Sequence, residues 1–116
     1  MENSMTSKIQ VAIDTYRSNR IPESIVLFEE ILNINHDNVE ILLPYINALR
    51  RVADYKKAKE VLAAFLEKDN SIARIHFEMG LTKKLDNEAP ETIIPHIEKA
   101  ISLGMTDANV WYLLGD

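Results

Sequence analysis

Similar residues recur along this chain at a fixed spacing, and that spacing restricts the folds open to it. The apolar residues that show it best differ in residue number by 34, 34 and 35, and they are Val11, Tyr45, Met79 and Leu114. The same steps separate their C-terminal neighbours, which are Ala12, Ile46, Gly80 and Gly115. A period of this length is typical of solenoids, in which each repeated unit buries its apolar face against the next one.

Each period contains two stretches with apolar residues at helical spacing, joined by short polar segments. The sequence predicts a first helix that begins near Ile9 and further helices over residues 21–34, 39–52, 56–69, 73–84 and 92–103, with a seventh that opens at Asp107. Ser7 and Gln10 resemble a capping box for the first helix, Ser71 can cap the fifth, and Gly104 suits the end of the sixth. The predicted secondary structure is therefore entirely helical.

Small and large residues of the second helices follow the same period. Ser24 and Ala58 are one period apart, as are Phe28 and Leu62 one turn later. The small residue lets two helices approach closely, and the larger one interdigitates with the neighbouring pair. With only three glycines, four prolines and 47% apolar residues, the composition also favours an all-α fold over a turn-rich β fold.

The pattern resembles that of the tetratricopeptide repeat family, whose unit is a 34-residue helix-turn-helix. Trp111, Leu114 and Gly115 match the Trp and Leu-Gly positions of the family's first helix. Tyr55 and Ala58 match the aromatic and small positions of its second helix. The resemblance implies an all-α, right-handed helical-repeat solenoid of antiparallel helix pairs, with about three repeats and one extra helix.

The resemblance implies a single domain over residues 1–116. Its repeats would cover about residues 5–38, 39–72 and 73–107, and a fourth would start at 108–116. The first repeat departs from the family pattern at Lys8, Ser24 and His36, and the third carries one extra residue within 85–91. Because the fourth repeat has only its first helix, we expect the chain to come from a longer protein or to cover that end by self-association.

The resemblance also implies a concave surface formed by the first helix of each repeat. The residues that would form a groove for a peptide or partner helix are Ile9, Ile13, Tyr16, Leu43, Asn47, Arg50, Arg51, Arg74, Phe77, Leu81 and Tyr112. An apolar strip flanked by cations suits a ligand with apolar anchors and some acidic groups. The alternative is that Ile9, Ile13 and Leu81 pack internally and that Arg50 and Arg51 form a solvated helix end.

One subset of the family grips the carboxylates of chaperone tails with Lys, Asn and Arg side chains. At those positions this chain has Ile9, Ile13, Pro44, Arg74 and Glu78, and only Arg74 is chemically compatible. Chaperone-tail binding is therefore not expected.

Pro44 and Pro95 fall inside predicted helices, where a proline removes a backbone donor, so either a kink or a late helix start is expected.

No pattern in the sequence indicates catalysis, a cofactor or a metal site. The three histidines, His36, His76 and His96, lack the paired spacing of a zinc helix, and no nucleophile elbow or phosphate loop occurs. Glu23, Glu29 and Glu30 lie off the apolar stripe of their helix, where we expect them to be solvated. We therefore expect a protein that is not an enzyme.

Charge and composition limit the remaining classes of partner. The formal net charge of -5 disfavours nucleic acid, and the chain has no cysteine and no apolar stretch of signal-peptide or membrane-span length. We expect a cytoplasmic protein that binds neither nucleic acid nor membrane. The favoured function is a protein-protein interaction scaffold. The alternatives are a self-association module, with a homodimer through the C-terminal repeat, and an N-terminal regulatory segment of a longer enzyme.

Overall fold

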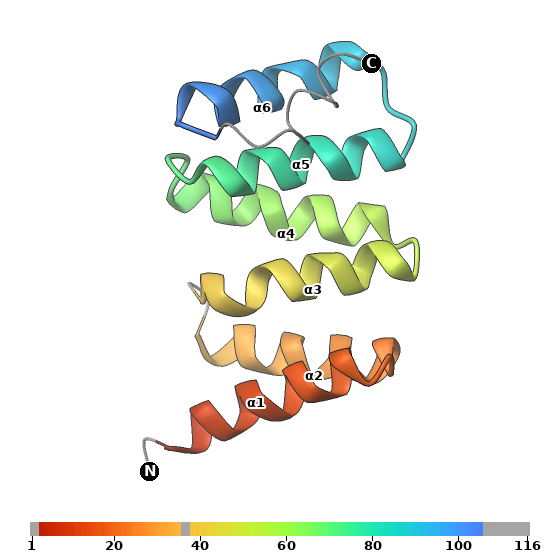
Figure 1. Cartoon of the computed structure of the whole chain (residues 1–116), viewed down its shortest axis with the longest axis vertical. Coiled ribbons are helices and arrows are strands. Elements are labelled where there is room, and N and C mark those ends of the chain that lie inside the picture. Colours follow the sequence, from red (N-terminus) through yellow and green to blue (C-terminus); the bar gives the residue numbers. More distant parts are fainter. Residues whose placement is uncertain (1–2, 36–37, 106–116) are drawn as a thin grey trace. The chain divides into compact units, whose positions relative to one another are not determined.

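The computed structural model describes residues 3–35 and 38–105, and every regular element in these ranges is an α-helix (Figure 1). The helices are α1 (Asn3–Arg17), α2 (Ile21–Ile34), α3 (Val39–Arg51), α4 (Tyr55–Lys68), α5 (Ala73–Leu85) and α6 (Pro90–Ser102). They fall into two compact units, Met1–Asp54 with α1 to α3 and Tyr55–Asp116 with α4 to α6. The predicted all-α class is confirmed.

The helix boundaries follow the sequence pattern closely in most places. α2 covers the predicted residues 21–34, and the ends of α3 to α6 lie within two residues of those expected. The prediction of a seventh helix from Asp107 lies outside the described residues. The single-domain organisation with three repeats remains a prediction, and the boundary between the two units, at Asp54, falls inside the second predicted repeat.

Two predicted helix caps are wrong. α1 begins at Asn3, so Ser7 lies inside the helix, and the Gln10 side chain donates to Asp14 one turn later at 2.9 Å. Ile72 precedes the first residue of α5 and offers no side-chain cap. Ser71 instead donates to the Asp69 carboxylate through its backbone N–H, at 3.0 Å, and through its hydroxyl, at 2.5 Å. These hydrogen bonds lower the pKa of Asp69 and close a local turn before the helix.

The same turn ends each first helix of the predicted repeats. Asn19, Ala53 and Asn87, each one period from the next, have positive φ angles of 67°, 61° and 60°. In each turn this residue donates its backbone N–H three residues back, and the following residue donates five residues back. That pair of bonds is the Schellman motif, which satisfies free carbonyls at a helix end. Gly104, with φ of 107°, repeats it after α6 and confirms the predicted cap.

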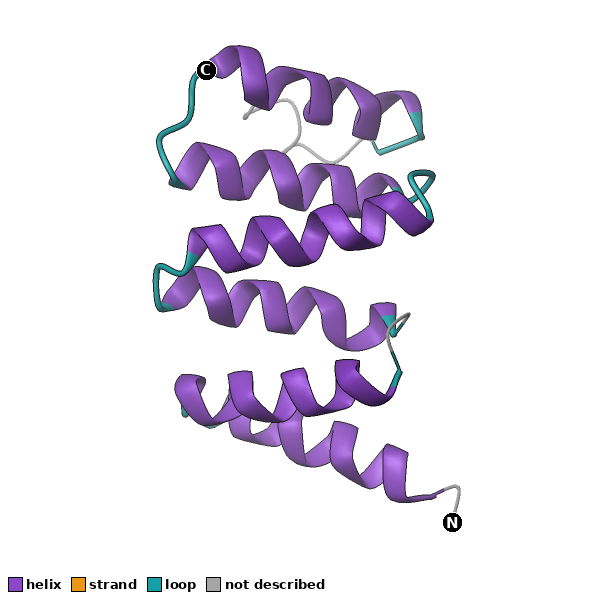
Figure 2. Ribbon diagram, turned by 180° about the vertical axis from the view of Figure 1, so that it is seen from behind, coloured by secondary structure: helices purple, strands orange, loops and turns teal. Residues whose placement is uncertain are grey.

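The extra residue of the third repeat lies in the loop between its two helices. Three residues, 18–20, join α1 to α2, and 52–54 follow α3, whereas four residues, 86–89, join α5 to α6. Figure 2 shows these connections as short teal segments at the helix ends. Since α5 has 13 residues, as α3 does, the longer loop takes up the extra residue and the period lengthens by one.

An aromatic row forms the centre of the first unit. The ring of Phe28 on α2 lies 6.1 Å from the ring of Tyr16 on α1 and 6.1 Å from that of Tyr45 on α3. Tyr45 is 1% exposed and donates its hydroxyl to Glu29 at 2.9 Å. Burial, with help from this acceptor, raises the pKa of Tyr45. Glu29 is thus half-buried and bonded, and the expectation that it is solvated is wrong.

The second unit has its tightest contact between α5 and α6. Phe77, Ile93, Ile97 and Ala100 form a buried cluster there. A Cβ atom added to Gly80 would lie 2.5 Å from Cδ1 of Ile97, closer than atoms can pack. The third repeat has no small residue at the position of Ser24 and Ala58, and the missing side chain of Gly80 provides the close approach instead.

Both internal prolines are accommodated inside continuous helices. Pro44 lies within α3, which starts at Val39, and Pro95 lies within α6, which starts at Pro90. The alternative of a late helix start is therefore wrong for both. Each proline removes one backbone donor from its helix.

The turn at Ala53 predicts that replacing alanine by glycine has opposite effects on stability at two positions of the chain. A left-handed conformation costs an L-residue roughly 1–2 kcal/mol, and this exceeds the entropic cost of glycine in the unfolded chain. We expect Ala53→Gly to raise the free energy of unfolding by about 0.5–1 kcal/mol in urea titrations. The same change at Ala63, exposed inside α4, should lower it by about 1 kcal/mol. A loss at both positions would contradict this explanation.

The contact at Gly80 gives a second stability prediction. Gly80→Val places a branched side chain against the fully buried Ile97, and overpacking of this kind costs about 1–3 kcal/mol. Urea unfolding followed by circular dichroism measures the loss. Glu98→Val is the matched control, because Glu98 is exposed on α6, and it should change the stability by less than about 0.5 kcal/mol. Equal effects of the two substitutions would contradict the close packing.

Candidate functional site

The predicted groove residues of the first unit lie on α1 and α3, which contact each other. Ile9, Ile13 and Tyr16 follow at the spacing that places side chains on one side of a helix, and Leu43 lies one turn before Asn47 on α3. All five side chains are half-buried. We call this surface the α1–α3 face. On each helix the aliphatic residues of this face precede its polar residue, Tyr16 on α1 and Asn47 on α3.

Hydrogen bonds fix the polar end of the α1–α3 face. The Asn47 amide donates to the Tyr16 hydroxyl and so links α3 to α1. Close by in sequence, Arg51 on α3 donates to the side chain of Asn19 at 2.5 Å. Arg51 remains exposed, as does Arg17 at the end of α1, whereas Arg50 is half-buried. Arg17 and Arg51 thus lie at the C-terminal ends of the two helices that carry the aliphatic side chains of the α1–α3 face.

The predicted groove residues of the second unit have a different environment. Phe77 is 5% exposed and belongs to the core of α5 and α6, so it is not available as an exposed anchor. The Arg74 guanidinium lies 5.6 Å from the centre of the Phe77 ring, and its Nε donates to the buried Glu78 at 2.7 Å. Leu81 is half-buried against the same core. Tyr112 lies outside the described residues.

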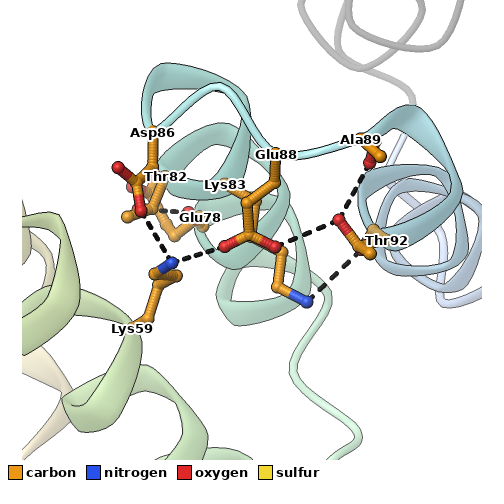
Figure 3. A network of polar contacts seen from close by, with 8 residues as sticks. All are labelled: Lys59, Glu78, Thr82, Lys83, Asp86, Glu88, Ala89 and Thr92. Carbon is orange, nitrogen blue, oxygen red and sulfur yellow. Dashed lines mark hydrogen bonds and ion pairs between the residues drawn. The ribbon is translucent and has the colours of Figure 1, made fainter.

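A polar network holds the loop between α5 and α6 (Figure 3). Lys59 on α4 donates to Asp86 at 2.8 Å and also to Glu88. Thr92, in the first turn of α6, donates to Glu88 at 3.1 Å and to the Ala89 carbonyl at 2.8 Å. The bonds to Asp86 and Glu88 raise the pKa of Lys59, and the bond from Lys59 lowers that of Glu88. The network therefore holds the loop by one lysine that bonds to two carboxylates.

Two histidines meet between α5 and α6. The rings of His76 and His96 lie 6.1 Å apart, and Nε2 of His76 is 2.7 Å from the Asn70 carbonyl oxygen. Nδ1 of His76 is buried with no hydrogen-bond partner in the described part of the chain. Burial lowers the pKa of His96, and Lys83 and His76 lower it further, against a smaller opposing effect of Glu88. These surroundings therefore favour the neutral form of the His96 ring.

A second surface of the first unit was not predicted from the sequence. One hollow of about 190 Å³ lies between α1 and α2, and its lining residues are Ser7, Lys8, Val11, Leu27, Glu30 and Ile31. Another, of about 390 Å³, is lined by Thr15, Arg20, Glu23, Val26 and Leu27. Val11 and Val26 are 53% and 54% exposed. Val11 is the one indication of this surface in the sequence, because it is apolar at a position where the equivalent residues, Tyr45 and Met79, are buried. The period alone, however, does not show which residues are buried.

Residues 3–35 and 38–105 contain no candidate for a membrane-spanning helix and no candidate metal-binding cluster. None of the helices in these ranges combines the length and apolar character that crossing a bilayer requires. In the same ranges, no three or more His, Asp or Glu side chains are grouped so that they could bind a metal ion.

Comparison with known proteins identifies the fold. No protein-family model matches the chain, and no curated protein matches it in sequence. Solved structures do match. The type III secretion translocator chaperone SycD of Yersinia enterocolitica superposes with a TM-score of 0.88 at 13% identity, over 99% of this chain and 90% of SycD. PcrH of Pseudomonas aeruginosa gives a TM-score of 0.87 at 11% identity, over 99% of this chain and 92% of PcrH.

A MamA protein also matches, with a TM-score of 0.85 and 22% identity. The match covers 99% of this chain but only 62% of that MamA chain, so this chain spans about three fifths of its length. These neighbours have a tetratricopeptide-like fold, and the likeness shows that this chain has that fold as well. The sequence resemblance is thus confirmed at the level of the fold. SycD has also been solved with a peptide of the translocator YopD and as an alternative dimer.

The environment of His96 predicts a pH-dependent stability. Its pKa is lower in the folded chain than its ordinary value of 6.5, so the unfolded chain binds more protons as the pH falls through that value. The free energy of unfolding should therefore decrease between about pH 7.5 and pH 5. His96→Gln removes this titration, and its stability should fall less steeply over the same range in urea titrations at several pH values. Parallel curves for the two proteins would contradict the assignment.

Proposed function

We propose that this chain is a protein-protein interaction module whose first unit binds a peptide or a partner helix on the α1–α3 face. The observations that carry this proposal are the half-buried aliphatic side chains Ile9, Ile13 and Leu43 and the hydrogen-bonded pair of Tyr16 and Asn47. Apolar side chains with a polar end are the usual means by which a helical surface holds an amphipathic ligand.

The charges at the end of this face suggest the chemistry of the ligand. Arg17 and Arg51 are exposed there, and Asn19 holds the Arg51 guanidinium in place. A guanidinium binds a carboxylate in a bidentate manner when its geometry is fixed. We infer a ligand that places aliphatic anchors against Ile9, Ile13 and Leu43, and an acidic group near Arg51.

Preorganisation would supply much of the affinity. Tyr16 packs on Phe28, which packs on Tyr45, so the residues beneath the α1–α3 face are fixed by the core of the unit. Binding then orders the ligand without having to order the receptor. A chain of the same fold, SycD, has been solved with a bound peptide, which supports peptide binding as a use of such a fold.

A role without catalysis fits the titratable groups of the described residues. The groups whose pKa departs from the ordinary value include Lys59, Glu88 and His96, and each has a structural partner or a packing cause. Matched ion pairs and buried rings shift pKa values without any chemistry to perform. We therefore infer that this chain is not an enzyme.

The test is selection of binding peptides on the wild-type chain from a displayed library, followed by titration with variants. We expect Ile9→Asp with Leu43→Asp to weaken the selected peptides by about tenfold or more, because both anchors become charged. Arg51→Glu should weaken peptides with an acidic group. Its matched control is Lys56→Glu, because Lys56 is exposed on α4 in the other unit.

Circular dichroism must show that each variant keeps its helices. Peptides that bind the double variant as tightly as the wild type would place recognition elsewhere. Equal loss on Arg51→Glu and Lys56→Glu would show that the charge effect is not local to the α1–α3 face.

A further inference from the structure

The surface between α1 and α2 has the features of a packing face without a neighbour among the described residues. Val11 is 53% exposed, whereas Tyr45 and Met79, which hold the same position in the next two periods, are 1% and 5% exposed. In the first unit Tyr45 is buried because α3 lies on α2. The residue type at Val11 is therefore suited to burial, but the described chain leaves it uncovered.

The two hollows on this surface share one residue. Leu27 lines both, with Val11 in the first hollow and Val26 in the second. Val26 is 54% exposed, and the first hollow, of about 190 Å³, exceeds the size of its isopropyl group. We call the surface of Val11, Val26 and Leu27, with these two hollows, the α1–α2 face. An exposed aliphatic side chain beside a hollow is the pattern of a surface that can interlock with its own copy.

The charges on the rim are self-complementary. The first hollow carries Lys8 and Glu30, and the second carries Arg20 and Glu23. All four side chains are exposed, and none makes an ion pair with another side chain in the described part of the chain. Each hollow thus offers one cation and one anion to whatever lies against it.

We propose that two copies of this chain associate through the α1–α2 face, with their α2 helices antiparallel about a two-fold axis at Leu27. This operation places the first hollow of each copy over the second hollow of the other. Val26 of one copy then enters the first hollow of the second copy. Lys8 faces Glu23 of the second copy, and Arg20 faces Glu30 of the second copy. The interface is isologous, so every contact occurs twice.

The antiparallel arrangement follows from packing and charge together. The alternative is a parallel dimer, with the two-fold axis along α2. It would set each hollow against the same hollow of the second copy, so that both stay unfilled. It would also bring Arg20 and Glu23 of one copy near the same residues of the other. The antiparallel arrangement fills the hollows and pairs opposite charges. Burial of the apolar centre supplies the affinity, and the exposed rim pairs mainly fix the register.

Sedimentation equilibrium over a range of concentrations tests the association. We expect the wild type to change from monomer to dimer with concentration. Val26→Asp should raise the dissociation constant about a hundredfold or more, because a carboxylate would enter two apolar hollows. Val52→Asp is the matched control, because Val52 is 44% exposed in the same unit but lines neither hollow. It should leave the dissociation constant unchanged.

A charge exchange tests the register. Lys8→Glu should raise the dissociation constant about five- to tenfold, because it sets two carboxylates against each other at two contacts. Adding Glu23→Lys in the same chain should restore it. Without restoration, the antiparallel register is wrong.

A disulfide cross-link tests the position of the two-fold axis. Since the chain has no cysteine, Leu27→Cys should also form a disulfide-linked dimer on mild oxidation, whereas Ala63→Cys on the exposed side of α4 should not.

Two results would overturn the proposal. One is a wild-type chain that stays monomeric at all concentrations, which would assign the α1–α2 face to a different occupant. The other is a dimer that Val26→Asp leaves intact. The Ile9→Asp, Leu43→Asp variant should dimerise like the wild type, so loss of peptide binding and loss of self-association are separate outcomes.

Discussion

The left-handed residue at the end of each first helix is the constraint on which the rest of the structure depends. At Asn19, Ala53 and Asn87 a positive φ angle ends one helix, and two backbone bonds satisfy its last carbonyls within the turn. In the first unit this turn returns α2 along α1, and in the second it returns α6 along α5. The turn tolerates residues other than glycine because its hydrogen bonds offset part of the backbone strain. Its recurrence once in every repeat gives the chain its period, and side-chain packing then follows from where the helices begin.

Close approach of paired helices can be reached from either side of the contact. Ser24 and Ala58 are fully buried small residues in second helices, and the sequence predicts this role for them. The third repeat instead carries Ile93 in its second helix and Gly80 in its first, where Ile97 occupies the space of a side chain. Close approach of two helices requires that the side chains that face each other be small in total, and the small residue can lie on either helix. A comparison of this second-helix position alone therefore makes the third repeat look like a poor match to the others. The structure shows that its two helices still pack closely.

Period and helical spacing were sufficient to predict the fold, because they report which residues face a neighbour. They fixed the ends of α2 and the extra residue of the third repeat, and they placed Gly104 at a helix end. The predicted caps at Ser7 and Ser71 were wrong because a capping side chain has alternative partners: Ser71 bonds to Asp69, and α1 simply continues past Ser7 towards the N-terminus. For the site, the family resemblance implied a groove that includes Ile9, Ile13 and Tyr16, and this stays a prediction. The resemblance did not show that Phe77 belongs to a core, since burial depends on how α6 lies against α5.

Residues at one repeat position need not have one environment, and this separates the packing residues from the candidate binding residues. Val11 and Tyr45 occupy the same position, but Tyr45 is covered and bonded to Glu29, whereas half of Val11 is exposed. The same physical preference that stacks one helix pair on the next is therefore unsatisfied on the α1–α2 face. The α1–α3 face differs, because its side chains are half-buried by their own unit and its polar end is already bonded. An uncovered packing face favours a partner that resembles the chain itself, and a partly covered strip with fixed polar groups favours a smaller ligand.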